Sequence, residues 1–208
     1  MAVLQGSLLA TGPAAGPRPL GADVERTALA GGAWVDLRRS WVEGADDLFV
    51  RLMGSVPWQA QRRTMYDRMV DVPRLQSFYD EGSDASDPVL SECARALGRH
   101  YLPELGEPFG TLGLCLYRNG DDSVAWHGDT IGRGAVEDTV VAIVSLGASR
   151  AFLLRPAAGG RSIRFELASG DLLVMGGSCQ RTWQHAVPKT RRPVGPRISA
   201  QFRPPGVR

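Results

Sequence analysis

Two histidines and one aspartate are the residues of this sequence that most clearly suggest chemistry. His127 and Asp129 are two residues apart, and His185 follows much later. Two imidazoles and one carboxylate can occupy one face of an octahedral Fe(II) ion and leave three positions open for a cosubstrate and O2. On a strand, residues i and i+2 point to the same side, so one short segment can supply two ligands. The sequence therefore suggests a non-haem iron oxygenase site, with the third ligand supplied by a distant strand.

The spacing of His127 and Asp129 is weak evidence alone, because such pairs arise by chance and His127 could be a surface turn residue beside Trp126. The sequence has three histidines. His100 falls at the end of a predicted helix, where a cation interacts favourably with the negative end of the helix dipole, so a structural role is expected for it. His127 and His185 lie in glycine-punctuated, strand-like sequence, in the order that the iron site requires.

The C-terminal segment 197–203 has the period-2 alternation of a strand and would place Arg197, Ser199, Gln201 and Arg203 on one face. Two arginines turned into a small barrel are costly unless an anion lies there. Guanidinium groups bind carboxylates through paired hydrogen bonds and keep their charge, so this face suits the dianion 2-oxoglutarate. The alternative is an edge strand with this face in solvent, which would be favoured without the two histidines and the aspartate.

Strand-like segments separated by Gly, Pro or Asp turns dominate the second half of the chain. They are 111–119, 138–147, 149–157, 162–170, 171–177 and 198–204. Six or more strands within about 95 residues favour a sandwich or jelly roll over a parallel sheet with crossover helices. Upstream, the patterns predict a strand at 33–37, a helix at 40–55 capped by Ser40, a strand pair with connecting loops at 57–80, and a helix at 87–101.

Bulk properties indicate an ordinary globular chain. It has 208 residues, 43% hydrophobic and 22% charged, with a net charge of +2. Residues 1–30 are rich in Gly, Ala and Pro and are expected to form a flexible arm before a single domain at 31–208. The three cysteines contain no C-x2-C pair, which disfavours a zinc site and suggests reduced thiols in a cytoplasmic protein. With no long apolar run and no basic signal region, we expect no membrane partner, and we expect a monomer.

The region from Leu114 to Arg203 resembles the AlkB family of Fe(II)/2-oxoglutarate-dependent dioxygenases. The matching stretches are LYRNGDDSVAWHGD, VVAIVSLGASRAFLLR, SGDLLVMGGSCQRTWQHAVPK and GPRISAQFR, in the family's order. Upstream, VPW and DVPRLQSFYD resemble its nucleotide-recognition lid, at about 57–80. The resemblance implies a mostly β (α+β) protein, a double-stranded β-helix or jelly roll at about 111–204, with flanking N-terminal helices.

By position, the resemblance implies that His127, Asp129 and His185 hold Fe(II). Arg197 and Tyr117 would bind the distal carboxylate of 2-oxoglutarate, and Arg203 would lie near the end that chelates the metal. The cosubstrate site would also include Cys115, where the family often has Asn, and Ser199 and Gln201, in place of Asn and Thr. These changes predict altered cosubstrate affinity. Acidic residues often follow the second ligand in the family, but Thr130 and Ile131 stand here and leave base preference open.

The implied activity is oxidative demethylation of N-alkylated bases in DNA, possibly RNA, with Fe(II), O2 and 2-oxoglutarate, releasing succinate, CO2 and an aldehyde. A base in a duplex must be flipped out, so single-stranded substrate is expected to suit the enzyme. The residues expected to contact it are Trp58, Tyr66, Arg74, Phe78, Tyr79, Trp126 and Thr130, with Arg62, Arg63, Arg68, Lys189, Arg191 and Arg192 as candidate phosphate contacts. The alternatives are an oxygenase acting on RNA, a modified nucleoside or a non-nucleic substrate, and a binding module without turnover.

Overall fold

The computed structural model describes residues 15–65, 68–80, 83 and 87–207, without the side chains at 63–65, 68 and 70. Two antiparallel sheets face each other. In spatial order, the larger contains β2 (Glu25–Ala28), β3 (Ala33–Arg38), β12 (Leu172–Gly177), β9 (Val141–Gly147), β14 (Arg197–Arg203), β7 (Thr111–Tyr117), β6 (Arg68–Tyr79) and β5 (Gln59–Met65). The smaller contains β11 (Ile163–Leu167), β10 (Arg150–Pro156), β13 (Trp183–Val187) and β8 (Val124–His127).

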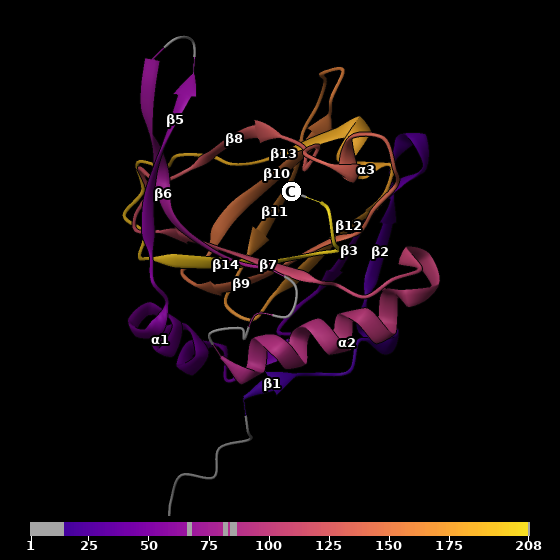
Figure 1. Cartoon of the computed structure of the whole chain (residues 1–208), viewed down its shortest axis with the longest axis horizontal. Coiled ribbons are helices and arrows are strands. Elements are labelled where there is room, and N and C mark those ends of the chain that lie inside the picture. The colour runs from indigo at the N-terminus through magenta and orange to yellow at the C-terminus, as the bar shows by residue number, and fades with distance from the viewer. Residues whose placement is uncertain (1–14, 66–67, 81–82, 84–86, 208) are drawn as a thin grey trace, which may run out of the picture.

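The remaining elements flank these sheets. They are the two-stranded pair β1 (Gly16–Pro17) and β4 (Val42–Glu43), the helices α1 (Ala45–Ser55), α2 (Pro88–Leu105) and α3 (Cys179–Thr182), and the 3-10 turns η1 (Gly21–Asp23), η2 (Ala30–Gly32) and η3 (Arg133–Ala135). Figure 1 shows α1 and α2 beneath the larger sheet and the smaller sheet on its other side. The predicted mostly β jelly roll with N-terminal helices is confirmed.

Alternation along the central strands divides the apolar residues into two cores. On β14, Ile198, Ala200 and Phe202 pack in the same cluster as Leu48 and Leu52 of α1 and five buried residues of α2, Val89, Leu90, Cys93, Leu97 and Tyr101. The second cluster lies between the sheets and includes Tyr117, Ile143, Phe152 and Leu154. Because successive side chains point to opposite faces, each central strand serves both cores, and the inner face of β14 is left to its polar residues.

Helix α2 is well defined by its ends. The side chain of Asp87 accepts a hydrogen bond from the Val89 backbone N–H at 2.9 Å, and Pro88 occupies the first helical turn, where a missing N–H costs nothing. The helix ends at Gly106, whose φ of 75° suits glycine. It therefore continues past His100, which packs edge-to-face on Tyr101 at 4.7 Å between ring centroids. The prediction that His100 ends the helix is wrong.

Helix α1 begins later than the sequence pattern predicted. Ser40 has a positive φ of 48°, and its backbone N–H donates to Asp171 Oδ1 at 2.9 Å instead of the side chain capping a helix. The strand β4 comes next, and Gly44 is the residue before the first turn of α1. The predicted cap at Ser40 is therefore wrong, because a tertiary contact to the loop before β12 takes up this residue.

The predicted strand pair at 57–80 is the hairpin β5–β6, and β6 also pairs with β7. The lid is thus continuous with the sheet that forms the cavity floor. At the N-terminal end, β1 pairs with β4 and β2 pairs with β3, so residues 16–28 are docked where a flexible arm was expected; residues 1–14 lie outside the described part. Within the described residues, no helix is long and apolar enough to span a membrane.

Core packing on α2 gives the first testable prediction. Leu97 is fully buried, whereas Leu102, on the same helix, is 50% exposed. Leu97→Ala should lower the free energy of unfolding by about 2–5 kcal/mol, because it leaves a cavity under the sheet. The matched control Leu102→Ala should change it by no more than about 0.5 kcal/mol. Urea denaturation monitored by circular dichroism measures both, and equal losses would contradict the assigned packing.

Candidate metal and cosubstrate site

Three side chains converge between the two sheets. His127 is the last residue of β8, His185 lies on β13, and the strand register pairs the two directly. Asp129 follows two residues after β8. One ligand atom from each of the three residues lies within 4.8 Å of the others, and the two imidazole centroids are 4.2 Å apart. The structure therefore brings together the three residues that the sequence suggested as iron ligands. The sequence around both histidines is expected to be strand-like, but β8 and β13 are not among the individual strands that the sequence pattern delimits.

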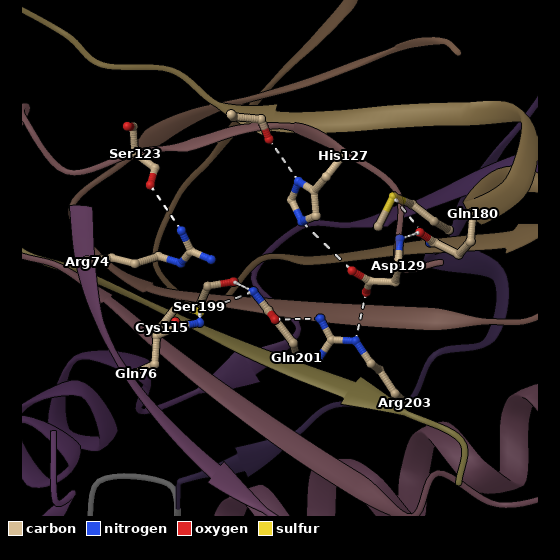
Figure 2. Close-up of polar contacts among 12 residues, drawn as sticks. Arg74, Gln76, Cys115, Ser123, His127, Asp129, Gln180, Ser199, Gln201 and Arg203 are labelled. Atoms are coloured by element: carbon tan, nitrogen blue, oxygen red, sulfur yellow. Dashed lines mark hydrogen bonds and ion pairs between the residues drawn. The ribbon is translucent and has the colours of Figure 1, made fainter. Parts of the chain in front are cut away.

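A backbone contact fixes how His127 presents its ring. Its Nδ1 lies 2.8 Å from the Ala125 carbonyl oxygen, and its Nε2 lies 3.8 Å from Asp129 Oδ1 (Figure 2). Because a carbonyl oxygen can only accept, Nδ1 must carry the proton. The Nε2 lone pair is then free for a metal and points toward the carboxylate. Such a hydrogen bond to the non-ligating nitrogen is a common means of orienting metal-binding histidines.

The buried ligands have the charge states that a metal site needs. Burial lowers the pKa of His185 to about 3, assisted by the nearby His127, so this imidazole is neutral and can ligate. Burial favours the neutral form of Asp129 and would raise its pKa. The positive charge of Arg203, the neighbouring His185 and the hydrogen bond from Arg203 act in the opposite direction and together outweigh burial. The net pKa of Asp129 is therefore well below its usual range. At neutral pH the site therefore presents a neutral His185 imidazole and an ionised Asp129 carboxylate.

Asp129 is held on both sides. Arg203 Nε donates to Asp129 Oδ2 at 2.7 Å, and the Asp129 backbone N–H donates to Gln180 Oε1 at 2.9 Å (Figure 2). Gly128 permits this close approach, because a Cβ there would lie 2.3 Å from the Gln180 carbonyl oxygen. The glycine between the two ligands is therefore a steric requirement of the fold. Asp129 Oδ1 stays directed toward the histidines.

The other end of β14 suits a carboxylate. Arg197 is 1% exposed, its Nε donates to Ser145 Oγ at 2.8 Å, and its Nη1 has no partner. Its guanidinium lies 5.3 Å from the centroid of the Tyr117 ring, which lines the adjoining cavity. Burial raises the pKa of Tyr117 to about 12, so its phenol is protonated and can donate. A buried guanidinium nitrogen without a partner is costly, and an anionic ligand would satisfy it.

Between these ends, two amide groups surround Cys115. Gln76 Nε2 lies 3.5 Å and Gln201 Nε2 lies 3.6 Å from Cys115 Sγ, and Gln201 Oε1 accepts from Arg203 Nη2 at 2.6 Å (Figure 2). Gln201 Nε2 also lies 3.5 Å from Ser199 Oγ. Cys115 is thus flanked by long amides from the two neighbouring strands β6 and β14, and Ser199 by the amide of Gln201 on its own strand. Sequence reasoning missed Gln76, although the alternation of Arg74, Gln76 and Phe78 along β6 was a usable signal.

A cavity of about 550 Å³ opens above the three ligands and is lined from both sheets and the lid. Of the predicted substrate contacts, Arg74, Phe78 and Tyr79 line it. Trp126 does not: it lies under the Arg155 guanidinium at 4.1 Å, because the residue before His127 on a strand points the opposite way. Trp58 packs against the helix-side core. Thr130 is exposed and outside the lining.

Other predicted contacts lie elsewhere. Arg62 is exposed and pairs with Asp71 across the hairpin at 3.1 Å. Lys189, Arg191 and Arg192 are exposed on the loop before β14. Tyr66 and the side chains of Arg63 and Arg68 lie outside the described residues. The phosphate contacts therefore stay predictions.

Comparison with known proteins gives the family. The family model described as the 2OG-Fe(II) oxygenase superfamily matches residues 42–203. The chain belongs to the 2OG-Fe(II) oxygenase superfamily. Human alpha-ketoglutarate-dependent dioxygenase alkB homolog 3 is 32% identical over 181 residues, covering 78% of this chain and 62% of that protein. Human DNA oxidative demethylase ALKBH2 is 26% identical over 178 residues, covering 76% and 68%. These relatives support the AlkB resemblance within the superfamily.

The fold comparison agrees with this family. The solved structure of OsALKBH1 superimposes with a TM-score of 0.59 at 14% identity, over 85% of this chain and all of that chain. The superfamily's cofactor and cosubstrate are Fe(II) and 2-oxoglutarate, and the donor set fits both. His127, Asp129 and His185 would hold the metal, and the unpartnered Arg197 Nη1 would pair with a carboxylate. The chain spans less than two thirds of the length of human alkB homolog 3.

Metal binding tests the site directly. His185→Ala should weaken Fe(II) or Mn(II) binding by more than about 100-fold, since even hydrogen-bond partners of metal ligands contribute about 10- to 100-fold. His100→Ala is the matched control, because His100 lies on α2 in the outer layer and should leave metal affinity unchanged. Anaerobic titration calorimetry measures both affinities. Near-normal metal binding by His185→Ala would remove this residue from the ligand set.

Proposed function

We propose that this oxygenase demethylates N-alkylated bases in nucleic acid, with DNA as the first candidate. One observation carries the proposal: the three ligands and the lid residues Arg74, Phe78 and Tyr79 line a single cavity, which is large enough for a nucleobase beside the cosubstrate. The names of the relatives, a dioxygenase alkB homolog 3 and a DNA oxidative demethylase, support the same reaction. These names describe the activity of the relatives, and its assignment to this chain is our inference.

The proposed reaction balances with one O2 per methyl group. Bound Fe(II) supplies the activation of O2, and 2-oxoglutarate supplies two electrons as it becomes succinate and CO2. One oxygen atom enters succinate and the other enters a C–H bond of the N-methyl group. The resulting N-hydroxymethyl base breaks its C–N bond, the nitrogen regains a proton, and formaldehyde leaves. The products are therefore the unmodified base, succinate, CO2 and formaldehyde.

The protein's part in this reaction is positioning and exclusion of water. Arg203 keeps Asp129 ionised and oriented, while Phe152 stacks on the His185 ring at 5.4 Å and covers it. Arg197 and Tyr117 would hold the distal carboxylate of the cosubstrate. The strand β14 thus carries both the arginine that orients the metal ligand and the arginine that anchors the cosubstrate. Fixed donors and acceptors of this kind lower the barrier because they need no reorganisation.

The lid suggests how a base would enter. Phe78 lines the cavity and is 55% exposed, an unusual position for a large aromatic side chain. A methylated base inside a duplex cannot reach the ligands between the sheets, so it must be extruded or already unpaired. An exposed aromatic ring at the mouth can stack on such a base whatever its sequence. We therefore assign Phe78 a stacking role and favour single-stranded or locally unpaired substrate.

Two alternatives are tested by the same assay. One is an oxygenase acting on RNA, a modified nucleoside or a non-nucleic substrate, and the other is a binding module that has lost turnover. The complete ligand set with a neutral His185 and an ionised Asp129 argues against the second. Decarboxylation of 2-oxoglutarate, measured with and without methylated oligonucleotides, separates the three possibilities.

Cosubstrate binding gives the third prediction. Arg197→Ala removes a buried cation and should cost roughly 2–5 kcal/mol of 2-oxoglutarate binding. The dissociation constant should therefore rise by about 30-fold or more. Arg197→Lys keeps the charge but loses the paired hydrogen bonds, so its dissociation constant for 2-oxoglutarate should lie between those of the wild type and of Arg197→Ala. Calorimetric titration of the metal-loaded protein with 2-oxoglutarate measures all three, and an unchanged affinity in Arg197→Ala would exclude Arg197 from the site.

The fourth prediction concerns nucleic acid. Binding of a methylated oligonucleotide should weaken linearly with the logarithm of salt concentration, with a slope of a few phosphate contacts. Methylated single strands should release formaldehyde at least as fast as matched duplexes, because no partner strand must be opened. Affinity and formaldehyde release are measured on single strands, duplexes and free methylated nucleosides. Equal turnover of the free nucleoside, without salt dependence, would instead favour a small-molecule oxygenase.

A further inference from the structure

The charges around the cavity restrict which methylated bases it can accept. Among the described residues that line it, the carboxylates are Asp129 and Asp80. Asp129 is committed to Arg203 and to the metal position. Asp80 is exposed and follows the last residue of β6. Neither offers a free carboxylate in the interior of the cavity, where the base would lie beside the metal.

The positions that follow Asp129 do not supply one. Thr130 is exposed and does not line the cavity, whereas Ile131 does line it and is 64% exposed. The residue that reaches the cavity wall after the second ligand is therefore an uncharged hydrocarbon. It can contact a base, but it can neither neutralise a positive charge nor accept a hydrogen bond from an amino group.

A free cation faces the cavity instead. Arg74 lines it from β6, and its Nη1 donates to the Ser123 carbonyl oxygen at 3.3 Å (Figure 2). Its Nε is buried and has no partner. A guanidinium keeps its charge in proteins and only donates hydrogen bonds. Arg74 thus places a fixed positive charge at the cavity wall, and it leaves a donor without an acceptor.

Methylated bases fall into two electrostatic classes. 1-Methyladenine and 3-methylcytosine are cations at neutral pH, and each has an exocyclic nitrogen that donates hydrogen bonds. 1-Methylguanine and 3-methylthymine, like 3-methyluracil, are neutral and present an exocyclic carbonyl oxygen beside the methylated nitrogen. A cationic base would be repelled by the fixed charge of Arg74, whereas a carbonyl oxygen could accept a hydrogen bond from that guanidinium.

We propose that the cavity selects neutral keto bases methylated at the ring nitrogen, 1-methylguanine and 3-methylthymine or 3-methyluracil, over the cationic bases 1-methyladenine and 3-methylcytosine. The inference rests on the proposed demethylase function and specifies its substrate class. Arg74 is the donor that reads the carbonyl, and Ile131 is the residue whose uncharged side chain leaves cationic bases unneutralised. Both act on specificity and neither is a metal ligand.

The test uses single-stranded oligonucleotides of one sequence, each with one of the four DNA bases, and a uracil counterpart in RNA. The full-length enzyme with Fe(II) and 2-oxoglutarate should repair the keto bases with kcat/KM at least about tenfold higher than the cationic bases, the factor that about 1.4 kcal/mol provides. The guanine, thymine and uracil arms identify which keto base is preferred. Equal or higher kcat/KM on 1-methyladenine or 3-methylcytosine would overturn the proposal.

Charge introduced at the cavity wall provides the second arm. Ile131→Asp should shift the ratio of cationic to keto turnover by about tenfold toward the cationic bases, because it places a carboxylate on the cavity wall. Val136→Asp is the matched control, because Val136 is 77% exposed and does not line the cavity, and its ratio should match the wild type. No shift in Ile131→Asp, or the same shift in both variants, would overturn the proposal.

The final variant distinguishes the selectivity between the two classes of base from the demethylase activity itself. Arg74→Gln should lower kcat/KM for the keto bases while turnover of the cationic bases holds or rises; an equal loss on both classes would overturn the role of Arg74. Binding of 2-oxoglutarate by titration calorimetry serves as the readout of an intact site. If 2-oxoglutarate binds normally and no base of either class is demethylated, the proposed function fails as well. Turnover with the reverse preference leaves that function standing and overturns only the selectivity.

Discussion

The buried ion pair between Arg203 and Asp129 is the interaction on which the site depends. It joins the last residue of β14 in the larger sheet to the ligand that follows β8 in the smaller one, at 2.7 Å. A carboxylate buried among apolar residues would otherwise be protonated, and removing one partner of a buried pair costs about 3–5 kcal/mol. The pair therefore serves both the closure of the two sheets and the ionisation of a metal ligand.

The same strand carries a second constraint. The outer residues of β14, Ile198, Ala200 and Phe202, are buried in the helix-side core, while Arg197, Ser199 and Gln201 face the cavity side. A one-residue slip in register would exchange these two faces and bury two arginines beneath the helices. Packing against α1 and α2 thus fixes the register that places Arg197 and Arg203 on the inner face of β14. Fold stability and site geometry therefore both depend on the alternation of inward and outward side chains along β14.

The side chains in the interior of the cavity are held in place by their contacts, whereas those at its mouth are exposed or keep an unpartnered donor. His127 has its tautomer set by the Ala125 carbonyl, and His185 is kept neutral by burial, so the ligands need no rearrangement to receive a metal. Near the mouth, Phe78 and Ile131 are exposed and uncharged, and Arg74 keeps an unpartnered donor. The interior thus holds the candidate metal ligands in place, while the residues near the mouth are those that, under the proposed function, would select the substrate.

The sequence by itself determined the mostly β jelly roll, and it singled out the three candidate metal ligands and the strand that carries the two arginines. These follow from residue types and from period-2 alternation, which are local properties of each segment. It could not determine that Gln76 lies beside Cys115, that Trp126 points away under Arg155, or that Ile131 rather than Thr130 reaches the cavity. It also misplaced the start of α1, because Ser40 is bonded to Asp171, and the end of α2, which extends to the left-handed Gly106. Alternation tells which residues of one strand share a face, but only the pairing and packing of distant segments decide what lies across from that face.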